Sequence, residues 1–349
     1  MNPPIQLMLD SGAFTAHTQS KIINLNEYCE FILKNQQHIE RSVCLDVIGP
    51  NNPEVAAAAG MANFKTMLDK GIMSMPVLHA RERVAWLDEM LKYTNVTGLS
   101  GTSLVSPRED KEWHRLIWAY CTDSNGFPIA NFHSFGNTSI PVLMTYPFFS
   151  ADSASWLISG SRAARIKIQG KSFQVRSSKI KDTNYILAGD TGPKKQSSDE
   201  AIRALGLNPD ILLSIEASPS QLAMLRSYCV AADLLQLKQR TISCTKYKTP
   251  ASLLSIKKQL TGGTERLHPV NLYFVLSPSA YAFNFPVLAA LNIKHVLVSF
   301  YYLVTSTPGF WDEKLLPFLY DPVGFCQSDP KVKVFWEKLH DVLLQPAMV

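Results

Sequence analysis

The sequence predicts an α/β protein built as a TIM-type (β/α)8 barrel, with a basic α+β insertion between strands 6 and 7. Three observations lead to this fold. Short apolar runs alternate with segments of helical periodicity, which is typical of a parallel sheet covered by helices. Eight such runs occur, and eight parallel strands favour a closed barrel over an open sheet. Polar residues recur where the runs end, as they do at the active-site face of such barrels.

Composition places the chain among folded globular proteins. Of 349 residues, 46% are hydrophobic and 18% charged, and the net charge of +5 permits an anionic partner without requiring one. Six cysteines include no pair at Cys-x-x-Cys spacing, which indicates reduced thiols in a cytoplasmic protein and no compact zinc site. The N-terminus has no basic and apolar leader, and no run of about 18 apolar residues occurs. We therefore expect neither a signal peptide nor a membrane span.

Six strand–helix units are expected within residues 1–156. Each strand is a short apolar run that ends at polar or glycine residues, and each helix repeats apolar residues at helical spacing, as Tyr28, Phe31 and Ile32 do. The expected strands are 5–10, 42–48, 74–79, 95–100, 129–136 and 149–153. The expected helices are 25–34, 54–69, 82–93, 110–121 and 140–146.

Residues 157–269 form the expected insertion. Apolar residues alternate around Gly170, which predicts a β-hairpin, and the stretch "SPSQLAMLRSYCVAADLLQLKQR" predicts a helix. From Arg162 to Lys195 the insertion carries nine Lys or Arg against two Asp.

The last two units are expected within residues 270–349. Strands are predicted at 270–278 and 295–303, with a helix through Leu291 between them, and a helix is expected near the C-terminus.

Side chains that carry chemistry stand at the carboxyl ends of the expected strands. In a (β/α)8 barrel these ends converge on one face, where active sites lie. Three carboxylates aimed at one cleft repel each other unless a substrate or a proton offsets their charge, so the pattern suggests chemistry. The residues are Asp10, Asp46, His79, Ser100, His133 and Asp152.

Each of these residues also has a structural interpretation. Asp10 before Ser-Gly can cap the next turn, and a single His is more often hydrogen-bonded within a fold than catalytic. The glycines near the strand ends can be ordinary turn residues. Recurrence at one face is what favours the functional interpretation.

Two carboxylates on opposite sides of a pocket suit glycosyl chemistry. One attacks the anomeric carbon through an oxocarbenium-like transition state, while the other handles the proton of the leaving group. Two Asp and one His can also hold a divalent ion, but no predicted helix shows paired i, i+4 ligands. We therefore expect no metal and no cofactor.

The motifs resemble, in order, those of the tRNA-guanine transglycosylase superfamily. "LMLDSGAF" is similar to the DSGGF signature of that family, and "LDVI", "PVLH", "TGLSGTS", "NFHSFGNTS" and "YPFFSADSASW" follow in the order that the family requires. They resemble most closely its phage and bacterial branch, the 7-deazaguanine DNA transglycosylases. The resemblance covers residues 5–156 and, loosely, the last two strands, and the insertion 157–269 has no counterpart.

The resemblance implies a role for each matching residue. Asp152 matches the nucleophile that displaces guanine and holds the nucleoside as a covalent glycosyl-enzyme, and Asp10 matches the general acid/base toward the departing and incoming bases. Asp46 matches a carboxylate that reads the donor edge of guanine or a 7-deazaguanine. His79 stands where the tRNA enzymes have Gln. The expected base-binding residues are Ser11, Asp46, His79, Gly98, Ser100, Gly101 and His133.

The neighbours of Asp152 fit this role. Ser150, Ser153 and Ser155 can donate hydrogen bonds that keep the carboxylate ionised. Trp156 is expected either to wall off the pocket or to pack in the core.

A base within a duplex must be extruded before attack, so a basic surface for the nucleic-acid backbone is expected. The alternative is a solvated hairpin without a partner. The candidate residues are Arg162, Arg165, Lys167, Lys171, Arg176, Lys179 and Lys181.

Two departures from the family pattern concern the substrate. The tRNA enzymes carry a zinc site of closely spaced cysteines and a histidine after the nucleophile strand, whereas this chain has only Cys229 and Cys244 there, far apart. We therefore expect no zinc, which puts tRNA as substrate in doubt. Ala13 replaces the second glycine of DSGGF, a mild change unless the backbone needs a positive φ.

The leading hypothesis is exchange of guanine in DNA for a 7-deazaguanine base such as 7-cyano-7-deazaguanine. Alternatives are the same exchange on tRNA and a catalytically silent nucleic-acid-binding subunit of a modification or defence system. A barrel lyase or aldolase would usually need a strand-end Lys or a metal site, and no such Lys occurs. The aromatic stretch 300–311 suggests a protein partner or homo-oligomer.

Overall fold

The structure is a computed structural model of the chain. It describes residues 3–49, 52–101, 105–162, 165–168, 171–174, 194–214, 218–240, 246–256 and 269–344. The chain forms two compact units. One comprises Met1–Ser153, Leu237–Val275 and Lys294–Phe310, and the other comprises Ala154–Gln236, Leu276–Ile293 and Trp311–Val349.

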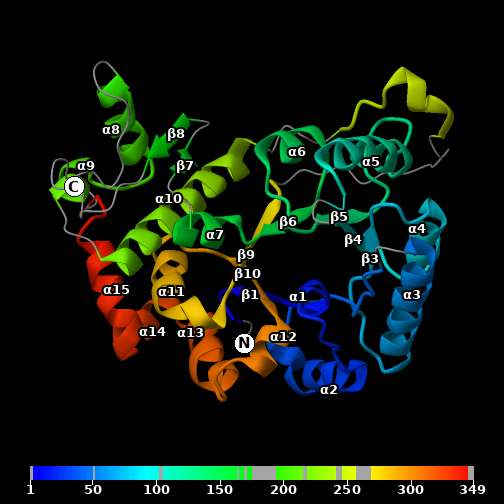
Figure 1. The fold of residues 1–349 in the computed structure, drawn as a ribbon, viewed down its shortest axis with the longest axis horizontal. Coiled ribbons are helices and arrows are strands. Elements are labelled where there is room, and N and C mark those ends of the chain that lie inside the picture. The colour runs from blue at the N-terminus through cyan, green and yellow to red at the C-terminus, as the bar shows by residue number, and fades with distance from the viewer. Residues whose placement is uncertain are drawn as a thin grey trace. The chain divides into compact units, whose positions relative to one another are not determined.

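The first unit contains a curled, all-parallel sheet of eight strands (Figure 1). Their order across the sheet is β2-β1-β10-β9-β6-β5-β4-β3. The eight parallel strands predicted from the sequence are thereby confirmed. The strands are β1 (Gln6–Asp10), β2 (Arg41–Ser42), β3 (Val77–His79), β4 (Val96–Ser100), β5 (Asn131–Ser134), β6 (Ser150–Ser153), β9 (Asn271–Val275) and β10 (His295–Ser299).

Strands β2 and β3 stand at the two ends of this order, and an isolated bridge lies between the segments beside them. Val43 and Met75 form a parallel bridge. The Met75 amide donates to the Ser42 carbonyl at 2.8 Å, and the Cys44 amide donates to the Met75 carbonyl at 2.9 Å. Contact between the two ends of the sheet therefore consists of one bridge rather than a ladder.

A hydrophobic cluster fills the inner side of the curled sheet. Side chains from both ends and from the middle of the strand order meet in it, which requires the sheet to curve around them. Beside the cluster, the Tyr28 hydroxyl donates to the Val43 carbonyl at 2.7 Å and lies 3.2 Å from the Leu9 carbonyl. The cluster comprises Met8, Val43, Met75, Val77, Val96, Tyr273 and Leu297, with Phe135 and Val275 packed against it.

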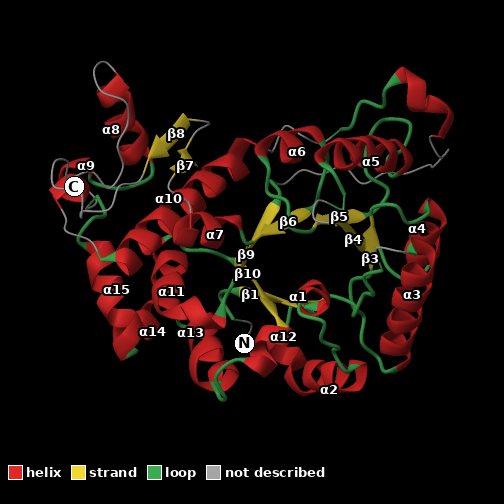
Figure 2. Cartoon of the chain, in the orientation of Figure 1, coloured by secondary structure: helices red, strands yellow, loops and turns green. Residues whose placement is uncertain are grey.

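Helices of the first unit lie outside the curl (Figure 2). Three of them begin with a side-chain cap: the side chains of Asn24 and Asn52 accept from the first turns of α2 and α3, and Ser106 forms a capping box with Glu109 at α5. The helices are α1 (Ala13–Thr18), α2 (Leu25–Asn35), α3 (Pro53–Asp69), α4 (Val84–Met90), α5 (Pro107–Tyr120), α6 (Ile140–Thr145) and α12 (Phe300–Thr305).

The second unit is mostly helical. The predicted hairpin is present as β7 (Arg165–Ile168) paired antiparallel with β8 (Lys171–Gln174), and the predicted long helix is α10 (Pro219–Arg240), whose last residues belong to the first unit. No described helix is long and apolar enough to cross a membrane. The other helices are α7 (Ser155–Arg162), α8 (Lys194–Ala204), α9 (Pro209–Ser214), α11 (Tyr281–Ala290), α13 (Leu316–Tyr320), α14 (Pro322–Ser328) and α15 (Pro330–His340).

Several expected strands are longer than the observed ones. Those predicted at 74–79, 129–136 and 270–278 are observed as Val77–His79, Asn131–Ser134 and Asn271–Val275, and two others end well before expected. The strand predicted at 42–48 ends by 43, because the chain turns where the Asp46 amide donates to the Cys44 carbonyl. The strand predicted at 295–303 ends at Ser299, and Phe300 begins α12. The Phe300 ring packs beside the Tyr28 ring at 5.0 Å between centroids, so packing against α2 outweighs the β-propensity of the aromatic run.

Candidate active site

Strand register places the predicted residues of β1 and β3 on the inner face of the sheet. Side chains two positions apart on a strand share a face. Asp10 therefore shares the face of Met8, and His79 shares the face of Val77, and both apolar residues belong to the inner cluster. Asp10 and His79 are the last residues of their strands. They thus lie at the carboxyl end, above the core.

The same reasoning applies to the strands on the far side of the sheet. Directly paired residues of parallel strands face the same way, and Asp152 pairs with Tyr273 of the inner cluster. His133 pairs with both Ser150 and Gly98. Four predicted residues, Asp10, His79, His133 and Asp152, therefore project to one side from four separate strands.

Asp152 is held by two donors. It is 6% exposed, and its Oδ1 atom lies 3.1 Å from His133 Nε2 and 3.1 Å from the Gly136 amide. Gly136 has a φ of 66°, a left-handed conformation that suits glycine in the turn after β5. Ser150 was predicted to donate to Asp152, but its hydroxyl lies 2.8 Å from His133 Nδ1 instead. Trp156 is fully buried, as the core-packing interpretation expected.

Asp10 is the carboxyl whose protonation is most altered. Burial, then the negative charges of Asp46 and Asp152, raise its pKa from 3.8 to about 7, although backbone amides of Gly12 and Ser11 oppose the shift. The Gly12 amide donates to Asp10 Oδ2 at 3.0 Å, so Asp10 also caps the turn into α1. The structural interpretation of this residue is thereby confirmed, and the chemical interpretation stays a prediction.

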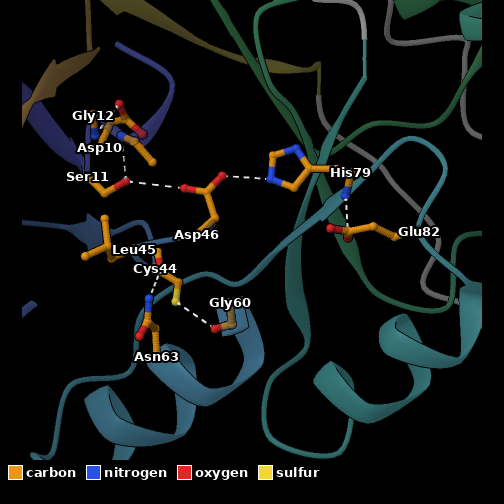
Figure 3. Close-up of polar contacts among 11 residues, drawn as sticks. Asp10, Ser11, Gly12, Cys44, Leu45, Asp46, Gly60, Asn63, His79 and Glu82 are labelled. Atoms are coloured by element: carbon orange, nitrogen blue, oxygen red, sulfur yellow. Dashed lines mark hydrogen bonds and ion pairs between the residues drawn. The ribbon is translucent and has the colours of Figure 1, made fainter. Parts of the chain in front are cut away.

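Asp46 lies between two predicted partners (Figure 3). The Ser11 hydroxyl is 3.4 Å from its Oδ1 atom, and His79 Nε2 is 2.7 Å from its Oδ2 atom. The segment that carries Asp46 is tied to α3, because the Asn63 side chain donates to the Leu45 carbonyl at 2.8 Å. Asp46 thus reaches the site from a loop rather than from a strand.

His79 and Glu82 form a buried acid–base pair beside Asp46. Burial lowers the pKa of His79, but its hydrogen bond to Asp46 and the charge of that residue outweigh burial and raise it overall. Burial also raises the pKa of Glu82 to about 7, against the opposing charge of His79. The His79 amide donates to Glu82 Oε2 at 2.8 Å, while His79 Nδ1 is buried without a hydrogen bond in the described structure.

The three residues predicted around β4 serve different purposes. Gly98 leaves room for the Phe135 ring, which would lie 2.2 Å from an added Cβ atom. Ser100 ends β4, pairs with His79 and is partly exposed. Gly101 has little space for a side chain, because an added Cβ would lie 3.0 Å from Ala80 Cβ. All three stay candidate base contacts.

The predicted backbone-binding residues lie on or near the hairpin of the second unit. Arg162 ends α7, Arg165 and Lys167 lie on β7, and Lys171 begins β8. Arg176, Lys179 and Lys181 lie outside the described residues.

Three residues of the site were not predicted. Glu82 was expected only as the first residue of a helix at 82–93, whereas α4 begins at Val84 and leaves Glu82 in the loop after His79. Gly136 acts through its amide, which side-chain patterns do not reveal. Ser299 faces the same side as Asp10, with which it pairs, and the overlong strand expected at 295–303 concealed its place at a strand end.

No three His, Cys, Asp or Glu side chains form a metal-binding group within the described part of the chain. Comparisons with family models, with curated proteins and with solved structures give no match. The chemistry of the site therefore has to be inferred from its own geometry.

Proposed function

We propose that this chain exchanges guanine in DNA for a 7-deazaguanine base through a covalent aspartyl-glycosyl intermediate. One observation carries the proposal: Asp10 and Asp152 share one face at the carboxyl end of the sheet but differ in protonation environment. Asp152 accepts two hydrogen bonds, which stabilise a carboxylate, whereas Asp10 is shifted toward its protonated form at neutral pH. Such a pair suits one nucleophile and one acid/base.

Asp152 is the proposed nucleophile. Its carboxylate attacks C1′ of the nucleotide while the bond from C1′ to N9 of guanine breaks, and the base leaves with the electron pair. The resulting ester to C1′ remains reactive, so a second base can displace the carboxylate in the reverse sense.

Asp10 is the proposed acid/base. With a pKa of about 7 it is partly protonated at neutral pH and can supply a proton to the departing guanine. The carboxylate that this leaves can take the N9 proton of the incoming base when that base attacks C1′. Proton and charge then return to their starting positions.

Asp46 is the proposed reader of the base. A carboxylate accepts from the N1–H and exocyclic amino groups that guanine and 7-deazaguanines present on one edge. Ser11 and His79 hold its two oxygens in place, and each oxygen keeps a further lone pair for the base. Gly98, Ser100 and Gly101 are the proposed neighbours of the bound base.

The proposed framework is a closed TIM-type barrel. The bridge between Val43 and Met75, together with a cluster that draws side chains from both ends of the strand order, supports closure. The resemblance in motif order to the tRNA-guanine transglycosylase superfamily supports the same framework and the same chemistry.

DNA as the polymer follows from the resemblance to the DNA-acting branch and from the absence of a cysteine cluster in the sequence. The basic insertion is the proposed backbone-binding element. A cytoplasmic location is proposed because no disulfide joins Cys29, Cys44, Cys121, Cys229 and Cys326 in the described part of the chain. A protein partner or second copy is proposed at α12, where Tyr302 and Val304 are exposed.

The test is incorporation of labelled guanine or labelled 7-cyano-7-deazaguanine into DNA and into tRNA by the purified protein. Label is expected in DNA, and Asp152→Asn is expected to reduce it by a factor on the order of 10³ or more. Asp69→Asn, at an exposed position ending α3, is the control and is expected to match the wild type.

Label in tRNA alone would overturn the choice of polymer. Label in neither polymer, from folded protein that binds both, would point instead to a silent binding subunit.

A further inference from the structure

The two donors that hold Asp152 converge on the same oxygen. His133 Nε2 and the Gly136 amide each lie 3.1 Å from Oδ1. No hydrogen bond from the described residues reaches Oδ2. The two oxygens of this carboxylate are therefore not equivalent, and the difference arises from β5 and the turn after it rather than from β6 itself.

The protonation of the His133 ring follows from its neighbours. An ionised carboxylate only accepts hydrogen bonds, so Nε2 must carry a proton toward Asp152. In a neutral ring Nδ1 is then an acceptor, and the Ser150 hydroxyl at 2.8 Å supplies the donor. His133 is fully buried, which leaves no solvent to exchange for these partners. Ser150, His133 and Asp152 thus form one directed chain of hydrogen bonds.

We propose that His133 is a positioning residue that fixes Oδ1 and thereby assigns Oδ2 as the attacking atom. The inference rests on the proposed base exchange and adds which atom reacts and what aims it. The sequence motifs imply contact between His133 and the base, whereas both ring nitrogens already have protein partners.

The reacting bonds follow from this assignment. Oδ2 forms a bond to C1′ as the bond from C1′ to N9 breaks, and the electron pair leaves with the base, which takes a proton from Asp10. When the ester forms, the carboxylate loses its negative charge and the hydrogen bonds to Oδ1 become weaker. Their donors, His133 and Gly136, stay in place. The same fixed Oδ1 holds the ester in place for attack by the incoming base.

Two amide substitutions separate the contact with Asp152 from that with Ser150. The amide nitrogen of Gln lies as far along the side chain as Nε2, while the amide oxygen of Asn lies as far as Nδ1 and can accept from Ser150. His133→Gln keeps a donor toward Asp152 and is expected to remain within about tenfold of wild-type turnover. His133→Asn keeps only the contact with Ser150 and is expected to lose on the order of a hundredfold in kcat with KM for DNA unchanged.

The two variants remove the same ring from the same buried position, so general damage to the fold affects them alike. Melting temperatures of both, with single-turnover formation of the covalent protein–DNA adduct, complete the comparison. Equal loss in the two variants would overturn the positioning role, while the proposed exchange would stand on the wild-type activity.

A second measurement is independent of activity. In protein with ¹⁵N-labelled histidine, NMR is expected to show His133 as the neutral tautomer with its proton on Nε2, and Asp152→Asn is expected to shift that signal. A proton on Nδ1 overturns the inference whether or not the enzyme turns over. An inactive wild type with the expected tautomer would overturn the proposed exchange and support the fixed Oδ1.

Discussion

Asp10 has an observed structural role and is also the proposed acid/base. Its Oδ2 atom accepts from the Gly12 amide, which orders the turn into α1, while burial and the charges of Asp46 and Asp152 work against ionisation. A group that is costly to ionise within the fold lowers stability in the pH range where the unfolded chain would ionise it. The same property makes it a proton donor near neutral pH.

This predicts a pH-dependent effect of Asp10→Asn on stability. Unfolded Asp10 ionises near pH 3.8 and folded Asp10 near pH 7, so the folded protein binds an extra proton between these values. Wild-type stability is therefore lost as pH rises from about 4 to about 7. The variant, whose amide oxygen still accepts from Gly12, is expected to gain up to roughly 4 kcal/mol relative to wild type between pH 4 and pH 8, because about three pKa units separate the folded and unfolded states.

Urea unfolding of both proteins across this pH range measures the difference between their unfolding free energies. The titration of Glu82 and other groups occurs in both proteins and cancels in this difference. A difference that does not change with pH would show that Asp10 ionises normally in the fold.

The sequence predicted the carboxylates of this site better than their partners. Asp10 and Asp152 stand at the ends of apolar runs, and the period of a strand then settles the face on which they lie. Glu82 and the Gly136 amide have no such marker, because a loop residue and a backbone group reach the site only through the turn that carries them. Asp46 was predicted as a strand-end acid, but its strand ends by residue 43 and the loop that follows carries it to the site.

The start of α1 depends on one glycine. Gly12 has a φ of 83°, and an added Cβ would lie 2.3 Å from Ser299 Oγ and 2.6 Å from Tyr301 Cβ. The turn therefore needs both a left-handed backbone and the absence of a side chain. Ala13 is not among the residues of positive φ, which explains why alanine is tolerated there in place of glycine.

Gly12→Ala and Gly71→Ala together separate these two requirements. Gly71 has a φ of 79° but no atom within 4 Å of an added Cβ. Gly71→Ala is expected to cost roughly 1 kcal/mol of unfolding free energy from backbone strain alone. Gly12→Ala is expected to cost a further 1–3 kcal/mol, approximately, from the clash with Ser299 and Tyr301.

Chemical denaturation of the two variants measures both losses of unfolding free energy, the one from backbone strain and the one from the clash. Equal losses would mean that β10 and α12 move aside without cost, and that the close approach is not a constraint.

Helices were easier to predict than strand ends for a physical reason. α2, α3 and α5 begin at capping residues that can be recognised in the local sequence. The end of a strand depends instead on where its partner strand ends. Nothing between Ser299 and Phe300 marks the change from β10 to α12. That change is caused by packing of Phe300 on Tyr28, which lies far away in the chain.

The two ends of the strand order meet only at the segments beside β2 and β3. The amides of Cys44 and Met75 are therefore the local reporters of whether the sheet is closed in solution. The Cys44 amide donates to the Met75 carbonyl at 2.9 Å and the Met75 amide donates to the Ser42 carbonyl at 2.8 Å. Both residues are buried.

Hydrogen exchange tests this closure. The amides of Cys44 and Met75 are expected to exchange as slowly as those of β1 and β10, because opening them requires separation of two strands. The amide of Ile39, bonded only within a short 3₁₀ turn, is the fast-exchanging control. Exchange of Met75 as fast as that of Ile39 would show an open sheet with two free edges.

The place of β9 in the sheet has a consequence for synthesis on the ribosome. β6 pairs with β9 and β1 pairs with β10, yet residues 154–270 separate β6 from β9. At about 5–20 residues per second, β6 waits roughly 6–24 seconds for β9 to emerge, and β1 waits longer still for β10. Exposed parallel edges can pair wrongly during that interval. The nascent chain therefore has its greatest need of chaperones after β6 is made and before β9, the seventh strand of the sheet, appears.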